Sequence, residues 1–279
     1  MYEVESLSNY ALPEKRREEM QPGDLKQRLY DQLALDYCCT PAEAADRKNQ
    51  FHVYVPLEGR RRFEEKPVTF LKVVSFRNKL MFTGDERIVA WCRSMYENDE
   101  GSWFMEPGNM RVLDCKLEEY GYCLDKIHPF FVPKDEVLES SAGNTCGTYQ
   151  DQDFDFRLYQ GTEIEAFRGD ARFKNAYSFC VTAPDVIGIA AFRGDDILGM
   201  AGASADSAVF WQIGIDVLPE ARGLGIGKIL VTRLRDEILK HDRVPYYGTA
   251  TSHMLSQNVA IASGFRPAWA ELTTRQLQD

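Results

Sequence analysis

The chain has 279 residues, of which 44% are hydrophobic and 12% aromatic, and it carries a formal net charge of −10. This length and composition are those of a globular protein with room for two ordinary domains. The acidity argues against a nucleic-acid partner, which would need a clustered basic face, and favours a cationic or neutral small molecule.

Neither a targeting segment nor a membrane segment is expected. The first twenty residues lack the apolar core of a signal peptide, and no run of about 18 uncharged apolar residues occurs. Seven cysteines without a C-x-x-C pair indicate reduced thiols rather than a disulfide framework or a zinc ribbon. We therefore expect a cytoplasmic protein with no metal site and no membrane partner.

The first half alternates helices and strands. Asp24 is the expected N-cap of a helix that ends near Asp36, and Thr40, Pro41 and Glu43 form a capping-box pattern that starts a second helix. The remaining patterns predict strands over 51–57, 67–76 and 128–134, helices over 85–96 and 110–121, and a strand or turn over 101–107. The basic run 60–62 is expected at a solvated hairpin tip, with anion binding as the alternative.

A polar segment over 133–153, rich in Ser, Gly, Thr and Asp, predicts a linker. We place the domain boundary in it, which gives an α/β amino-terminal domain over 1–145 and a second domain over 146–279. The second domain is predicted to hold strands over 154–160 and 245–251, a helix over 161–175, three strands within 186–219 with a hairpin at 193–196, and helices over 225–241 and 252–263. The helix-Gly-aromatic pattern of 117–133 returns at 260–272, which leaves open that the first half is a degenerate copy of the second.

Residues 222–227 read Arg-Gly-Leu-Gly-Ile-Gly between a predicted strand and a predicted helix. Glycines let backbone N–H groups approach a phosphate, and a helix start adds unpaired N–H groups and a positive dipole end. A Walker A loop is excluded because Ile229, not Ser or Thr, follows Lys228. A dinucleotide fingerprint is excluded because Lys228 stands where its last glycine belongs. A tight strand-helix corner is the structural alternative.

The pattern Arg-x-x-Gly-x-Gly, preceded by Val-Leu-Pro-Glu, closely resembles the acyl-coenzyme A loop of the GCN5-related N-acetyltransferase (GNAT) superfamily. The block SHMLSQNVAIASGFRPAW resembles the last conserved block of that family, in the right order. The resemblance covers roughly residues 155–279. It implies an α/β (α+β mixed) fold with a splayed mixed sheet flanked by helices, and acetyl-coenzyme A (acetyl-CoA) as cofactor. The first half looks like the amino-terminal region of bacterial two-part acetyltransferase-like proteins.

The resemblance also implies which residues contact the cofactor. The glycine loop would hold the pyrophosphate, and backbone groups of one strand would pair with the pantetheine arm in the gap beside it. The implied cofactor-binding residues are Ile215, Val217, Arg222, Gly223, Leu224, Gly225, Ile226, Gly227, Lys228, His253 and Ser256.

Acetyl transfer to an amine needs a polarised thioester carbonyl, a deprotonated amine and a protonated leaving thiol. Strand alternation puts Gln212 and Asp216 on one face, and Asp216 is the best candidate base, with a structural carboxylate as the equal alternative. Gln212 occupies a candidate position for the glutamate of many relatives and cannot act as a base. The family's usual tyrosine falls on Ala260, and its usual asparagine on His253.

The imidazole of His253 could therefore protonate the sulfur or carry the amine proton, with packing or capping as its alternative role. Ser256 could orient the site. Tyr246 and Tyr247 are further donors, one of which must point into the core. The predicted catalytic set is Asp216, His253, Ser256 and Tyr246.

These observations predict an acetyl-CoA-dependent N-acetyltransferase acting on a primary amine of a small molecule or peptide. A cationic acceptor is favoured, a homodimer is left open, and the first domain would shape the acceptor cleft between the halves or regulate it. The alternative is a catalytically impaired acyl-CoA-binding sensor or regulatory protein.

Overall fold

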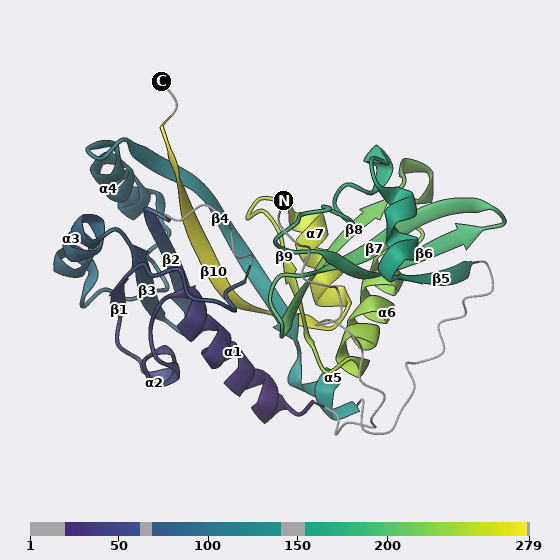
Figure 1. The fold of residues 1–279 in the computed structure, drawn as a ribbon, viewed down its shortest axis with the longest axis horizontal. Coiled ribbons are helices and arrows are strands. Elements are labelled where there is room, and N and C mark those ends of the chain that lie inside the picture. The colour runs from purple at the N-terminus through teal and green to yellow at the C-terminus, as the bar shows by residue number, and fades with distance from the viewer. Residues whose placement is uncertain (1–19, 62–68, 141–153, 278–279) are drawn as a thin grey trace, which may run out of the picture.

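Figure 1 shows the computed structural model, in which two α/β halves share one sheet. The structure describes residues 20–61, 69–140 and 154–277. Ten strands form a mixed sheet in the order β1-β3-β2-β10-β4-β9-β8-β7-β6-β5. The strands are β1 Gln50–Val53, β2 Leu71–Phe76, β3 Lys79–Gly84, β4 Tyr122–Pro133, β5 Asp155–Gln160, β6 Asp185–Arg193, β7 Asp196–Ala205, β8 Phe210–Val217, β9 Val244–Gly248 and β10 Phe265–Gln276.

Helices cover both faces of this sheet. The α-helices are α1 Pro22–Asp36, α2 Pro41–Ala45, α3 Glu86–Tyr96, α4 Pro107–Glu118, α5 Asp135–Ser140, α6 Ile226–Lys240 and α7 Met254–Ala262. Short 3₁₀ turns form η2 Gly161–Phe167, η3 Ala171–Phe173 and η4 Pro219–Ala221. None of these described helices is long and apolar enough to cross a bilayer.

Local sequence signals explain the start of α2 and the hairpin between β6 and β7. The predicted capping box of α2 is confirmed, since Thr40 N donates to Glu43 Oε2 at 2.8 Å and Glu43 N donates to Thr40 Oγ1 at 3.2 Å. The predicted hairpin is confirmed by the Arg193↔Asp196 pair that ends β6 and begins β7. Asp24 is not the N-cap of α1. It lies one turn inside the helix, where its carboxylate accepts from Gln21 N at 3.0 Å.

Residues 101–106 form turns, which is one of the two predicted alternatives for that segment. Three other segments differ from the sequence-based expectations. Helix α5 occupies part of the predicted linker, and β3 is an additional strand. The predicted helix over 161–175 is split into η2 and η3, because Gly169 adopts φ +83° between them.

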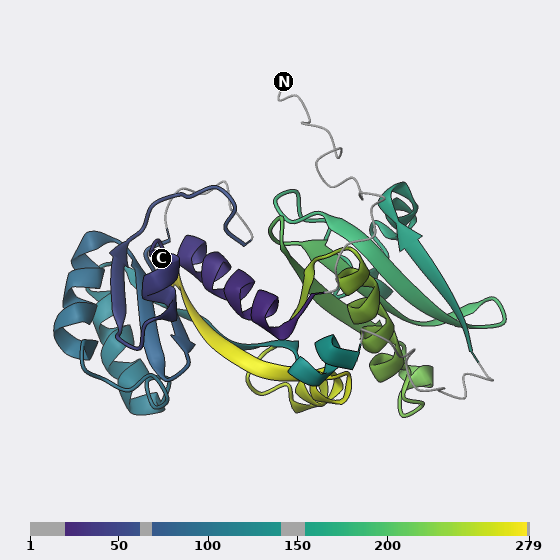
Figure 2. The ribbon, with the colours of Figure 1, turned by 90° about the horizontal axis from the view of Figure 1, so that it is seen from below.

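The two halves are joined by the exchange of long strands. β10 pairs antiparallel with β4 from Phe265↔Pro133 to Gln276↔Tyr122 and continues along β2, whereas β4 also pairs with β9. Figure 2 shows β10 curving from the carboxyl-terminal half toward the amino-terminal half. A strand of the first half thus lies between β9 and β10 in the second. The predicted boundary at 145/146 falls outside the described residues and stays a prediction.

Four apolar clusters fill the layers. Helix α6 covers the sheet of the second half on one face, and η2 and η3 cover the other. Helices α3 and α4 cover the outer strands of the first half, and α1 packs over the middle of the sheet. Figures 1 and 2 both show α1 between the two halves.

Arg61 corrects the interpretation of the basic run. Its side chain is 5% exposed and lies between Asp36, with Nε 2.5 Å from Oδ2, and Glu271. Its guanidinium also lies 4.9 Å from the ring centroid of Trp269. Because α1 and β10 bring two carboxylates to one buried point, Arg61 is neither a solvated tip residue nor an anion site. Arg62 lies outside the described residues.

Candidate functional site

The site begins where two parallel strands part. β8 and β9 pair from Phe210↔Val244 to Ile213↔Tyr247. β8 then continues to Val217 while it stays paired with β7, whereas β9 ends at Gly248. The gap opens on the β9 side of the last residues of β8.

The register of β7 and β8 shows which backbone groups face this gap. Leu218 N donates to Leu198 O at 2.9 Å, in line with the pair Gly199↔Val217. Successive residues of an antiparallel strand turn their N–H and C=O groups to alternate sides. Ile215 and Val217 therefore turn theirs away from β7 and toward the gap. They are the two residues at which the family resemblance places the pantetheine contact.

The glycine loop follows β8 directly. Gly223 and Gly225 have φ of +81° and +76°, a conformation that a side chain would strain, and a Cβ at either position would meet no heavy atom within 4 Å. Gly225 is the N-cap of α6, whose bond from Ile229 N to Gly225 O measures 3.2 Å. The loop and the first turn of α6 thus present backbone amides to open space.

Gap, loop and α7 surround one cavity of about 1110 Å³. Its wall includes ten of the eleven predicted cofactor-binding residues and three of the four predicted catalytic residues, two of which belong to both sets. The predicted residues that line it are Ile215, Asp216, Val217, Arg222, Gly223, Gly225, Ile226, Gly227, Lys228, His253 and Ser256. Leu224 is 43% exposed and Tyr246 is buried, and neither lines the cavity.

Tyr246 and Tyr247 are neighbours on β9, so their side chains point to opposite faces of the sheet. Tyr247 lines the cavity, and its hydroxyl lies 2.8 Å from Ser256 Oγ on α7. Tyr246 points to the opposite face, where its hydroxyl contacts Asp206 and lies 3.1 Å from Gln212 Oε1. The predicted catalytic set contains Tyr246, whereas in the structure Tyr247, not Tyr246, lines the cavity. Burial raises the pKa of Tyr247, so its hydroxyl keeps its proton at neutral pH.

Asp216 is held by amides of a neighbouring segment. Its carboxylate accepts from Asn175 N at 2.8 Å, from Ala176 N at 2.9 Å and from Asn175 Nδ2 at 2.5 Å. Both carboxylate oxygens therefore accept hydrogen bonds from N–H groups, and neither is left to take a proton from a substrate. This geometry matches the structural alternative that the sequence left open.

His253 and Gln212 both line the cavity. His253 is exposed, immediately precedes α7 and lines the cavity. Gln212 also lines it and, as an amide, offers no basic group.

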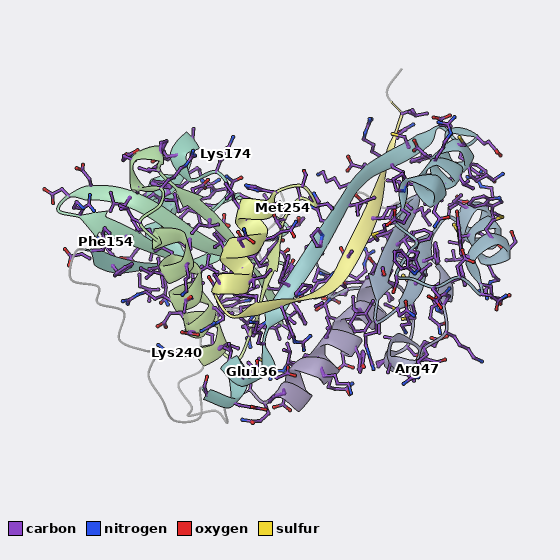
Figure 3. All side chains as sticks on the ribbon, turned by 180° about the vertical axis from the view of Figure 1, so that it is seen from behind. Arg47, Glu136, Phe154, Lys174, Lys240 and Met254 are labelled. Carbon is purple, nitrogen blue, oxygen red and sulfur yellow. The ribbon has the colours of Figure 1, made fainter. Side chains whose placement is uncertain are left out.

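Sequence reasoning missed a second wall of the cavity. It is built by residues of five separate segments, which meet only through tertiary packing and carry no local motif. These residues are Lys174, Asn175, Ala176, Ser178, Asp185, Ser204, Thr249 and Asn258. Figure 3 labels Lys174 and Met254, which lie on the same upper side of the carboxyl-terminal half in that view.

Residues 148–265 match the model of the acetyltransferase (GNAT) family. The carboxyl-terminal half is a GNAT domain. The match ends where β10 begins, so β4 and most of β10 lie outside it. GNAT proteins use acetyl-CoA, and the glycine loop, the outward-facing amides of β8 and the cavity of the GNAT domain fit that cofactor.

Several solved structures resemble the chain. A GCN5-related N-acetyltransferase-like protein from Streptococcus suis has 15% identity and a TM-score of 0.43 over 76% of this chain and 85% of that one. A protein of the GNAT family from Novosphingobium aromaticivorans has 13% identity and a TM-score of 0.39 over 55% and 66%. An aminoglycoside N-acetyltransferase in complex with coenzyme A has 23% identity and a TM-score of 0.33 over 41% and 89%. No curated protein matches the chain.

Proposed function

We propose that the protein transfers an acetyl group from acetyl-CoA to a primary amine of a small molecule or peptide. The observation that carries the proposal is the cavity itself, because it joins the glycine loop, the gap beside β8 and the head of α7 in one space of about 1110 Å³. That space can hold a cofactor and a second substrate together. When bound, acetyl-CoA supplies an activated acetyl thioester.

The cofactor end is formed by cations and amides. Arg222 and Lys228 line the cavity beside the glycine loop, and the first turn of α6 adds the positive end of a helix dipole. These groups bind and orient a pyrophosphate. The N–H of Val217, which faces the gap, is placed to polarise a carbonyl oxygen.

We assign proton transfer to residues of β9 and of α7 with the residue that precedes it. The Tyr247 hydroxyl and Ser256 Oγ form a hydrogen-bonded pair at 2.8 Å, and we assign them the proton that a leaving thiolate needs. His253, exposed at the head of α7, is assigned the proton of the acceptor amine. Because Asp216 is occupied by three N–H donors, we give it no proton to carry.

A cationic acceptor is supported by charge. The carboxylates of Asp185 and Asp216 line the cavity, and the whole chain carries a net charge of −10. Negative potential raises the local concentration of ammonium groups. We further propose a cytoplasmic location, with neither a nucleic-acid partner nor a membrane partner.

A second function is favoured by what the site lacks. Ala260 stands at the usual position of the family's tyrosine, Gln212 at a candidate position of its glutamate, and Asp216 is occupied. A domain that binds acyl-CoA without transferring the acyl group would show the same glycine loop. The alternative is therefore an acyl-CoA sensor.

Calorimetric titration with acetyl-CoA, followed by a free-thiol assay over spermidine, kanamycin and a lysine dipeptide, tests both functions. The variants Gly225→Val and Gly227→Val should lose binding while they remain folded by circular dichroism. Thiol release with any amine establishes the transferase. Binding without release establishes the sensor, and absence of binding by the wild-type protein refutes both.

A further inference from the structure

Three glycines lie side by side across the sheet of the GNAT domain. Gly188 of β6 is paired with Gly202 of β7, and Gly202 is paired with Gly214 of β8. Paired residues of neighbouring strands point their side chains to the same face of a sheet. On this face, the sheet therefore has a groove without side chains that is three strands wide.

The segment after η3 lies in this groove. A Cβ added at Gly202 would lie 2.2 Å from Ala176 O, and one added at Gly214 would lie 1.8 Å from Asn175 O. A Cβ at Gly188 would lie 1.9 Å from the Tyr177 hydroxyl oxygen. Such separations are far below van der Waals contact, so the segment reaches this depth only because all three positions are glycine.

Two carboxylates of the sheet hold the two ends of the segment. Asp216 of β8 accepts from the N–H groups of Asn175 and Ala176 at 2.8 and 2.9 Å. Asp185 of β6 accepts from Phe179 N at 2.7 Å and from Ser178 N at 3.4 Å. Hydrogen bonds to an ionised acceptor are stronger than those between neutral groups, so both ends are fixed to the sheet.

The fixed segment is also a wall of the cavity. Lys174, Asn175, Ala176 and Ser178 line it, on the sheet face opposite to the one that α6 covers. The other lining residues described above belong mainly to β8, β9, the glycine loop with the first turn of α6, and α7. The segment is thus placed to contact an acceptor rather than the cofactor phosphates.

We propose that residues 174–178 form a rigid acceptor-binding wall, pinned in the glycine groove by Asp216 and Asp185, which act as positioning residues. This rests on the proposed acetyl transfer. It assigns Asp216 a role in the KM for the amine, not in proton removal. It also explains why Asp216 lines the cavity although its oxygens are occupied.

The test compares two ways of releasing the segment. Asp216→Asn removes the charge that holds the amides, and Gly202→Ala displaces the segment while it leaves the Asp216 carboxylate in place. Asp85→Asn, which removes a helix-capping carboxylate of α3, and Gly108→Ala, whose new Cβ meets nothing within 4 Å, are the matched controls. If Gly202→Ala fails to fold, Asp185→Asn replaces it.

Amide hydrogen exchange in the full-length protein measures the pinning without any substrate. We expect exchange at Asn175 and Ala176 to rise by about tenfold or more in Asp216→Asn, and the segment to exchange faster in Gly202→Ala, with no change in the two controls. The dissociation constant of acetyl-CoA should stay within about twofold. Unchanged exchange in Asp216→Asn would overturn the pinning.

Kinetics with whichever amine of the panel is acetylated decide the role in the reaction. We expect both groove variants to raise the KM for the amine by roughly tenfold and to keep the acidic limb of the pH–rate profile. Loss of that limb in Asp216→Asn, with a normal KM in Gly202→Ala, would make Asp216 the base and refute the proposal. If the wild-type protein acetylates no amine, the proposed function and the acceptor role fail together, whereas exchange still decides the pinning.

Discussion

At the scale of single residues, Gly225 and Gly194 share a left-handed backbone conformation, one in the glycine loop and the other in the β6–β7 hairpin. Both have positive φ, +76° and +61°, and a Cβ at either would meet no atom within 4 Å. Gly225→Ala and Gly194→Ala should therefore each lose about 1 kcal/mol of unfolding free energy in urea titrations. Only Gly225→Ala should weaken acetyl-CoA binding in calorimetry, because only its methyl group enters the space in front of the loop. Equal affinities in the two variants would contradict the assigned site.

Tyr246 and Tyr247 allow a second comparison between neighbours. Tyr247→Phe removes a hydroxyl from the cavity and should lower kcat by about 10- to 100-fold with less than about 1 kcal/mol lost in stability. Tyr246→Phe leaves the buried carboxylate of Asp206 without that hydroxyl and should cost about 1–3 kcal/mol in unfolding free energy while kcat is kept. Steady-state kinetics and urea unfolding of both variants measure this. The reverse pattern would restore Tyr246 as the catalytic tyrosine.

Glu271 predicts how stability depends on acid. Burial by itself raises the pKa of Glu271, but the charges of Arg61 and Lys72 outweigh it and lower this pKa from 4.5 to about 2. A carboxyl whose pKa is depressed by folding stabilises the protein above its unfolded pKa, and this stability is lost as pH falls from about 4.5 toward 2. The loss amounts to about 3 kcal/mol at most.

Urea midpoints measured between pH 7 and pH 3 test this expectation. Glu271→Gln should be less stable than the wild type at pH 7, because Arg61 loses a buried partner. Its stability should also fall less steeply below pH 5, since one titrating group is gone. Parallel pH profiles would show that Glu271 is not the group responsible.

The sequence predicts a residue's position when the residues that determine it are close together in the chain, and not when they are far apart. The glycine loop and the capping box of Thr40 are local, so spacing alone indicates them. The choice between Tyr246 and Tyr247 depends on which face of β9 meets α7, and the sequence shows only that they differ. Arg61 is buried because α1 and β10 supply its partners from distant parts of the chain.

At the scale of elements, both copies of the repeated sequence pattern form a helix, a glycine with positive φ and a long strand. α4 leads through Gly121 into β4, and α7 leads through Gly264 into β10, with φ of +78° and +82° at the two glycines. The two strands then pair with each other. The sequence showed the similarity of the two units, but not their pairing, which joins residues far apart in the chain.

Helix starts also differ between the halves in a way that bears on function. α6 begins at Gly225 with its first amides toward open space, whereas α3 begins at Asp85, whose own carboxylate accepts from Arg87 N at 3.0 Å. A phosphate cannot take a place that a side-chain carboxylate already fills. Of these two helix starts, only that of α6 is therefore suited to a cofactor.

At the scale of the whole molecule, β4 makes the GNAT domain dependent on the amino-terminal half. Phe131 of β4 is 1% exposed and belongs to the same apolar cluster as α6 and β8. Residues 150–279 alone lack this side chain and leave β9 and β10 without the strand between them. The missing packing of one buried phenylalanine costs about 3–5 kcal/mol, and the unpaired strand edges add to this loss.

We therefore expect residues 150–279, produced alone, to show no cooperative urea transition and no acetyl-CoA binding by calorimetry. Co-production with residues 1–149 should restore both, because a strand supplied by a second chain completes a sheet as it does within one chain. Co-production with the same segment carrying Phe131→Asp should not, since a buried charge would enter the cluster. If residues 150–279 alone unfold cooperatively and bind acetyl-CoA like the full chain, β4 is dispensable. The amino-terminal half would then serve the acceptor or regulation alone, whereas dependence on β4 would give it a structural role in forming the cofactor site as well.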